Sequence, residues 1–128
     1  MKNLRYPKTF ETEEDLKKWL NENNIKYLWV FIFKNRDWKY SDLEGFEHLY
    51  RNGVELTKGV KVTHTWSFDN GDWAYKDLNG FEHLFRDGVE STKGVKAIYV
   101  DSYEDGGWEY IDKQYNRHEF DKDNNKIN

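Results

Sequence analysis

Three tryptophans, Trp38, Trp73 and Trp108, stand 35 residues apart in this sequence. The segments that begin at the first two, residues 38–61 and 73–96, are identical at 18 of 24 positions. The segment after Trp108 has diverged but keeps three residues in register with the others, namely Tyr110, Asp112 and His118. Similarity at a fixed spacing predicts a repeated structural unit whose copies stack to bury a shared core.

The chain of 128 residues has room for one hydrophobic core, so we expect a single domain spanning residues 1–128. Within it the spacing predicts three tandem repeats of about 35 residues after a non-repeated N-terminal segment. The expected boundaries are 1–23 for an N-terminal helical cap and 24–58, 59–93 and 94–128 for the repeats, the last of them degenerate.

Each repeat carries the pattern of short strands. Apolar and polar side chains alternate from Val60 to Phe68, which is the period of a half-buried strand. Residues 69–72 have turn chemistry, and Asp87-Gly88 is a favoured two-residue hairpin loop. The sequence therefore predicts an antiparallel meander of three or four short strands in each repeat.

Residues 78–87, and the equivalent stretch one repeat earlier, are ambiguous. Leu78, Phe81 and Leu84 also fit helical spacing, and Gly88 could end a helix, which would give a ββα repeat. The third copy keeps no such apolar stripe, so strands are favoured. A pseudo-threefold, β-trefoil-like closure of the repeats is a further alternative to an open sheet.

The N-terminal segment has different signals. Thr12 can cap a helix over residues 13–22, on which Leu16 and Leu20 share one face with Trp19, and Asn23 can end it. The expected fold class is therefore mainly β, or α+β by count, with this helix capping the meander and covering an open sheet edge.

Composition excludes several classes of protein. The 23 aromatic residues (6 Trp, 9 Tyr, 8 Phe) argue against disorder, and the absence of cysteine excludes disulfides and thiolate metal sites. No apolar run is long enough for a membrane span and no secretion leader is visible, so we expect a cytoplasmic protein without a membrane partner. Residues 101–128 hold the acidic excess, eight acids against four bases, and no basic patch predicts direct nucleic-acid binding.

Each repeat carries a Trp-x-Tyr-x-Asp sequence that could bind a ligand. Tryptophan and tyrosine anchor protein interfaces and stack on sugar rings, and a surplus of rings on a thin sheet could form an exposed strip. The same rings could instead build the core, because aliphatic residues are scarce. The candidate binding residues are Trp38, Tyr40, Asp42, Trp73, Tyr75, Asp77, Trp108, Tyr110 and Asp112.

Catalytic and metal chemistry find little support, so we expect no enzyme, no metal and no cofactor. His48, His83 and His118 occupy equivalent positions, which duplication of a structural role explains better than a three-histidine zinc site. Glu47 lies next to His48, but neighbours on a strand point to opposite faces. The acidic turns at 69–72 and 121–124 lack the bidentate glutamate of an EF-hand, and no nucleophile elbow is present.

These features favour a non-enzymatic binding protein that acts through its repeat β surface and its acidic C-terminal segment. We expect a protein or nucleoprotein partner. The frequent Lys, Asn, Ile, Tyr and Phe are typical of an AT-rich bacterial or phage genome, which suits an inhibitor, immunity or anti-defence protein. The alternative is a carbohydrate-binding module in which the three aromatic-aspartate sets act as equivalent glycan sites.

Overall fold

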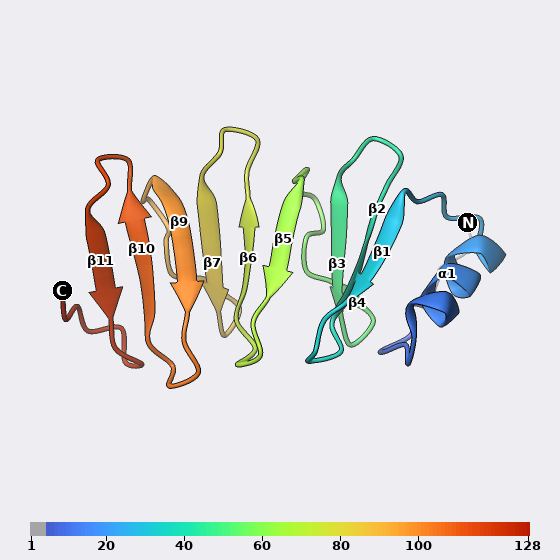
Figure 1. Cartoon of the computed structure of the whole chain (residues 1–128), viewed down its shortest axis with the longest axis horizontal. Helices are drawn as coiled ribbons and strands as arrows, with labels where there is room; N and C mark the ends of the chain where they lie inside the picture. Colours follow the sequence, from blue (N-terminus) through green and yellow to red (C-terminus); the bar gives the residue numbers. More distant parts are fainter. Residues whose placement is uncertain (1–4) are drawn as a thin grey trace. The chain divides into compact units, whose positions relative to one another are not determined.

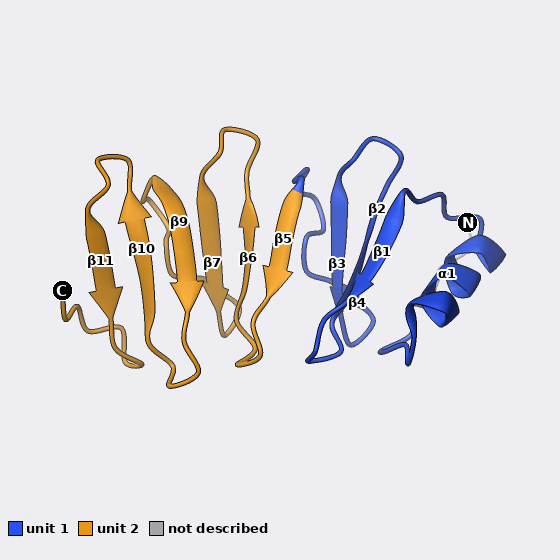
Figure 2. Ribbon diagram, viewed as in Figure 1, with its two compact units in different colours: residues 1–63 blue, residues 64–128 orange. Residues whose placement is uncertain are grey.

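The computed structural model describes residues 5–128. It is mainly β, with one short helix and three antiparallel sheets that are open rather than closed (Figure 1). The chain forms two compact units, residues 1–63 and residues 64–128 (Figure 2). The expectation of a single domain stays a prediction, as does closure about a threefold axis.

Unit 1 (residues 1–63) contains the helix and a four-stranded sheet of order β1-β2-β3-β4. Its elements are α1 (Glu13–Glu22), β1 (Trp29–Ile32), β2 (Trp38–Ser41), β3 (Glu47–Arg51) and β4 (Val54–Glu55). The helix begins where the sequence predicts, because the Thr12 hydroxyl accepts a hydrogen bond from the Asp15 N–H at 3.1 Å. Leu16 and Leu20 are fully buried in a core shared with Trp38 of the sheet. The prediction of this helix is confirmed.

Unit 2 (residues 64–128) contains a four-stranded and a three-stranded sheet, with strand orders β5-β6-β7-β8 and β9-β10-β11. The strands are β5 (His64–Ser67), β6 (Trp73–Lys76), β7 (Glu82–Arg86), β8 (Val89–Glu90), β9 (Ala97–Ser102), β10 (Trp108–Asp112) and β11 (Arg117–Phe120). Strands β7 and β9 lie side by side (Figure 1). Leu84 of the first sheet packs in one core with Val100 and Trp108 of the second.

The three sheets place corresponding aromatic residues opposite one another. On the hairpins β2–β3, β6–β7 and β10–β11 a tryptophan faces a tyrosine or phenylalanine, and the rings stack with centroids 4.2–4.5 Å apart. These pairs are Trp38–Tyr50, Trp73–Phe85 and Trp108–Phe120. Two residues along, a tyrosine stacks on a histidine in the same way, in the pairs Tyr40–His48, Tyr75–His83 and Tyr110–His118.

The favoured prediction of a strand within residues 78–87 is confirmed, because Glu82–Arg86 forms strand β7, and the helical ββα alternative is not adopted. The strand predicted from Val60 to Phe68 is only four residues long, His64–Ser67. The residues before it form a loop in which the Val62 carbonyl accepts a hydrogen bond from the Glu47 N–H at 2.8 Å. The alternation of apolar and polar residues in the sequence therefore extends beyond the residues that pair as strand β5.

In unit 2, the three-stranded sheet has charged residues at positions where the four-stranded sheet has apolar residues. Thirty-five residues after Ala74 and Leu84, both fully buried, the chain has Glu109 and Glu119. Arg117 pairs with both carboxylates, at 2.7 Å and 3.1 Å respectively. Glu109 is 8% exposed, so its carboxylate is mostly buried beside the guanidinium that pairs with it.

Candidate functional site

The structure divides each predicted Trp-x-Tyr-x-Asp set between the core and a turn. The three tryptophans are buried, with 0%, 8% and 3% of their surface exposed for Trp38, Trp73 and Trp108. Tyr40 is buried, whereas Tyr75 and Tyr110 are half-buried beside their histidines. The three aspartates, Asp42, Asp77 and Asp112, begin the turns that join β2 to β3, β6 to β7 and β10 to β11. A binding role for the complete sets, and with it the carbohydrate alternative, stays a prediction.

The turn that joins β2 to β3 is held by Asp42. Its Oδ1 atom accepts hydrogen bonds from the N–H groups of Glu44 and Phe46 at 2.9 Å and 3.0 Å. Its backbone N–H donates to the Phe46 carbonyl at 2.9 Å, and Gly45 adopts a φ of +90° that glycine tolerates without strain. We name residues 42–46 tip 1. The aspartate fixes the backbone of this tip in one conformation.

The same arrangement recurs between β6 and β7. There Asp77 Oδ1 accepts from the N–H groups of Asn79 and Phe81 at 2.9 Å and 3.0 Å, and Gly80 has a φ of +90°. We name residues 77–81 tip 2. Each unit of the structure therefore carries one Asp-Leu-x-Gly-Phe tip with the same backbone hydrogen bonds.

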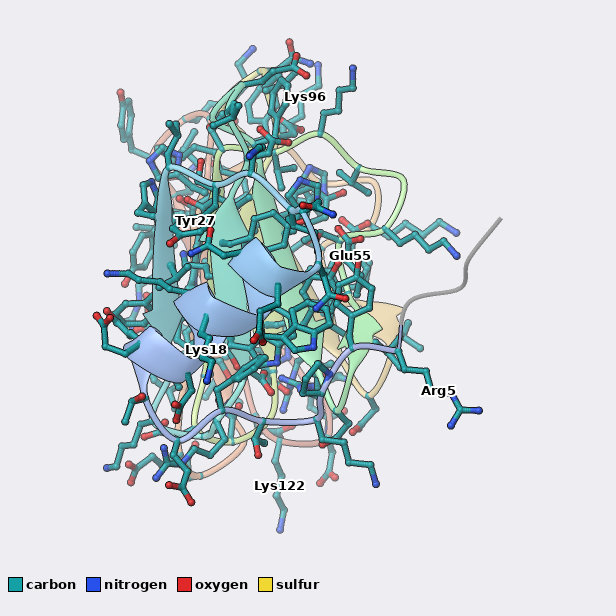
Figure 3. The ribbon with its side chains drawn as sticks, turned by 90° about the vertical axis from the view of Figure 1, so that its right-hand side faces the viewer. Arg5, Lys18, Tyr27, Glu55, Lys96 and Lys122 are labelled. Atoms are coloured by element: carbon teal, nitrogen blue, oxygen red, sulfur yellow. The ribbon has the colours of Figure 1, made fainter. Side chains whose placement is uncertain are left out.

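A histidine ties each tip to its sheet. In unit 1, His48 Nε2 lies 2.9 Å from Asp42 Oδ2 and His48 Nδ1 lies 2.8 Å from Glu55 Oε2. Thr57 donates its hydroxyl to the same glutamate oxygen at 3.0 Å. Glu55, labelled in Figure 3, is the second residue of β4 and pairs with Tyr50 of β3. The result is an Asp–His–Glu chain that runs from the tip across β3 to β4.

Unit 2 repeats this chain with Asp77, His83 and Glu90. The two nitrogen–oxygen distances are 2.8 Å to Asp77 and 2.7 Å to Glu90. Thr92 donates to Glu90 at 3.1 Å, as its counterpart does in the first sheet. All three groups of this chain are mostly shielded from solvent.

These contacts shift the ionisation of the groups involved. The hydrogen bond with Glu55, assisted by Asp42, raises the pKa of His48 above its ordinary value. Burial alone would lower the pKa of His83, but its hydrogen bonds with Asp77 and Glu90 outweigh burial and raise it. Burial likewise opposes ionisation of Asp42, yet its hydrogen bonds with His48 and backbone N–H groups lower its pKa.

Each tip displays apolar side chains to solvent. Leu43 is 60% exposed and Leu78 is 64% exposed, although leucine is a usual core residue. The half-buried phenylalanine of each tip has a lysine above its ring, with Lys61 Nζ 5.7 Å from the Phe46 centroid and Lys96 Nζ 5.9 Å from the Phe81 centroid. Figure 3 shows Lys96 beyond the ends of the strands.

The turn between β10 and β11 keeps the aspartate–backbone hydrogen bonding of tips 1 and 2 but lacks their leucine and phenylalanine. Asp112 Oδ1 accepts from the N–H of Asn116 at 3.0 Å, and Asp112 Oδ2 lies 2.8 Å from His118 Nε2. Lys113 stands where the other tips have leucine, and Asn116 stands where they have phenylalanine. The other nitrogen of His118 faces Lys126 Nζ at 2.9 Å instead of a glutamate.

Each histidine contacts the aspartate of its own turn. Among residues 5–128, no group of three or more histidine, aspartate or glutamate side chains is arranged to hold a metal ion. Sequence reasoning missed Glu55, Glu90 and the exposed leucines. A signal was available, since Val54-Glu55 and Val89-Glu90 follow a two-residue turn in both near-identical segments.

A second candidate is a cavity of about 310 Å³ at the C-terminal sheet, beside Tyr103 and Ile127. Its carboxylates already have partners: Asp105 accepts from the Gly107 N–H at 2.8 Å, and Asp121 accepts from two backbone N–H groups of its own turn. These oxygens therefore hold the local backbone.

Comparison of the chain with protein-family models, with curated proteins and with solved structures finds no match. Across the part of the chain that the structure describes, no helix is long and apolar enough to cross a membrane.

Proposed function

We propose that this chain is a non-enzymatic binding protein built from three copies of one β unit, and that tips 1 and 2 contact a protein or nucleoprotein partner. The observation that supports this proposal is the exposed leucine at the apex of each tip, Leu43 and Leu78, at 60% and 64% exposure. A leucine at a hairpin apex does not contribute to a core. The same exposed leucine stands at the same place on both ordered tips, next to a phenylalanine and a lysine, and this repeated arrangement is the surface that we assign to the partner.

The rigidity of the tips supports a role in binding. An interface gains affinity when its contact residues are ordered before binding, because less conformational entropy is lost on association. Asp42 and Asp77 each hold two backbone N–H groups of their tip, and His48 and His83 anchor the aspartates. The apolar side chains are therefore presented in a fixed backbone conformation.

Two equivalent tips suit a bivalent contact. A single tip presents four side chains, namely a leucine, a polar residue, a half-buried phenylalanine and the lysine above it, and these are too few for the about 800 Å² that each partner contributes to a stable protein interface. Two tips on one chain strengthen each other through effective concentration. An inhibitor, immunity or anti-defence role in a bacterium or phage remains our more specific hypothesis for such a protein.

The test is affinity capture from a lysate of the source cells, read by mass spectrometry, with wild-type chain and a Leu43→Ser/Leu78→Ser variant. We expect a stoichiometric protein partner whose recovery falls about tenfold or more with the variant, the loss typical of hot-spot removal. The matched control is Val54→Ser/Val89→Ser, since these valines are equally exposed, at 64% and 67%, but lie outside the tips. Equal capture by both variants contradicts the proposal.

A further inference from the structure

The Asp–His–Glu chains indicate that protonation of a histidine governs how rigidly each tip is held. This inference rests on the binding role that the proposed function gives to the tips. We infer that His48 and His83 are imidazolium cations that lock tips 1 and 2, and that loss of this proton releases the tips, whereas the turn of His118, which faces Lys126 in place of a glutamate, lacks this lock. The contacts of the three histidines with their neighbours carry this inference.

Counting donors and acceptors fixes the charge of His48. Asp42 Oδ2 and Glu55 Oε2 lie 2.9 Å and 2.8 Å from its two ring nitrogens. An ionised carboxylate can only accept a hydrogen bond, so both nitrogens must donate, and only the protonated ring has two N–H groups. The Tyr40 ring stacks on the imidazole at 4.8 Å, a geometry that also favours a cation.

His83 has the same surroundings in unit 2. Its nitrogens face Asp77 and Glu90 at 2.8 Å and 2.7 Å, and the Tyr75 ring stacks on it at 4.7 Å. The two carboxylates and the tyrosine are the titratable groups that contact this ring from the turn, from β8 and from β6. The raised pKa of both histidines agrees with this assignment.

His118 provides an internal comparison. One of its nitrogens faces Asp112, but the other faces the ammonium group of Lys126 at 2.9 Å. An ammonium group can only donate, so Nδ1 must accept and carries no proton. Nε2 then holds the single proton and donates it to Asp112. Three histidines at equivalent sequence positions therefore differ in charge because one neighbour differs, Lys126 in place of Glu55 or Glu90.

Deprotonation would break one end of each chain in tips 1 and 2. A neutral His48 has one lone pair, and that lone pair would point at a carboxylate 2.8–2.9 Å away. Repulsion would separate the ring either from Glu55 or from Asp42. Asp42 Oδ1 would still organise the turn itself. When the ring leaves Asp42, the tip would keep its turn but lose the side-chain contact that ties it to β3, so the exposed Leu43 would be presented less rigidly.

The test uses the full chain with histidine-selective ¹H–¹⁵N and leucine-methyl NMR between pH 6 and pH 9. At pH 7 we expect both ring nitrogens of His48 and His83 to show the shifts of the charged ring, and His118 to show the neutral Nε2–H tautomer. As the first two lose their protons, the methyl groups of Leu43 and Leu78 should gain mobility together. A neutral His48 and His83, a charged His118, or leucine methyls that keep their mobility through the titration would each overturn the inference.

A double variant tests the charge of His48 and His83 without unfolding the sheets. In Glu55→Gln/Glu90→Gln the amide can donate to a neutral ring, so His48 and His83 should become neutral at pH 7 while the sheets remain folded. Glu44→Gln is the matched control, because Glu44 is exposed in tip 1 and does not contact the histidine. The NMR readout needs no partner, so failure of partner capture with normal histidine charges would reject the proposed function and leave this inference standing.

Discussion

The Glu82 side chain accepts a hydrogen bond from the backbone N–H of Val100 at 2.8 Å, and this bond joins β7 to β9 inside unit 2. Glu82 is 8% exposed, and burial raises the pKa of its carboxyl although the Val100 N–H favours the ionised form. A raised carboxyl pKa in the folded state means that ionisation costs stability as the pH rises above the ordinary pKa.

Glu82→Gln should therefore stabilise the protein at pH 7. The amide oxygen can still accept from Val100, and the buried charge is gone. We expect a higher midpoint in urea at pH 7, and a difference that shrinks as the pH falls toward 4 and wild-type Glu82 becomes protonated. The control is Glu47→Gln at the equivalent position of unit 1, where the carboxylate pairs with Lys39 at 2.8 Å. That variant should lose stability, and a loss in both would contradict the role of burial at Glu82.

The stability of the whole chain should be greatest between about pH 4.5 and pH 6.5. The folded-state pKa of His48 and His83 is raised, so their contribution is complete below the unfolded value of about 6.5 and is lost as the pH rises through the folded value. The pKa of Asp42 and of Asp77 is lowered, so their contribution is complete above about pH 4 and is lost at lower pH.

Urea unfolding at a series of pH values measures this profile. His48→Gln/His83→Gln should remove most of the decline above pH 6.5, because the groups that lose the proton are absent. His118→Gln is the matched control and should leave the decline in place, since both charged histidines remain. A wild-type profile that is flat from pH 6 to pH 9 would show that the histidine contacts contribute nothing to folding.

Two leucines of one sheet should differ sharply in their contribution to stability. Leu84 is fully buried, whereas Leu78 in tip 2 is 64% exposed. Leu84→Ala should cost about 2–5 kcal/mol of unfolding free energy through lost burial and a cavity. Leu78→Ala should change it by less than about 0.5 kcal/mol. Chemical denaturation of the two variants gives both values, and a similar loss for both would mean that tip 2 is packed rather than presented.

The parts of the fold that could be predicted were those with local signals. The Thr12 cap and the apolar spacing of Leu16 and Leu20 gave the helix to the residue, because a helix forms from contacts three and four residues apart. The Asp-Gly and Asn-Gly pairs gave the turns. The alternation of side chains placed Trp38 and Tyr40 on one face of β2. It does not show what covers that face, so the sequence could not decide whether these rings belong to the core or to an exposed binding strip.

The tips were missed for a physical reason. The partnership of His48 with Glu55 spans two strands and depends on the register of β3 with β4, where Tyr50 pairs with Glu55. Register is a tertiary property that a single sequence does not display. The exposure of Leu43 likewise depends on the five-residue turn around it, and in the sequence it looked like one more apolar residue of a helical stripe.

The glycines of the two-residue turns offer a further prediction, because they share a conformation but differ in surroundings. Gly53 and Gly88 have φ values of +80° and +78°. A Cβ at Gly53 would lie 2.5 Å from the backbone oxygen of Tyr6, while among the described residues a Cβ at Gly88 meets no heavy atom within 4 Å apart from its chain neighbours. Alanine at either position adopts left-handed backbone at a cost of roughly 1–2 kcal/mol.

Gly53→Ala should therefore destabilise the protein more than Gly88→Ala. The Tyr6 backbone must move away from the new methyl group, and Tyr6 stacks on Tyr50 at 4.7 Å and packs against Trp19 at 5.0 Å. The additional loss should appear in urea unfolding, together with a change in near-ultraviolet circular dichroism that Gly88→Ala lacks. Equal losses without a spectral difference would show that the segment around Tyr6 does not pack against the β3–β4 turn in solution.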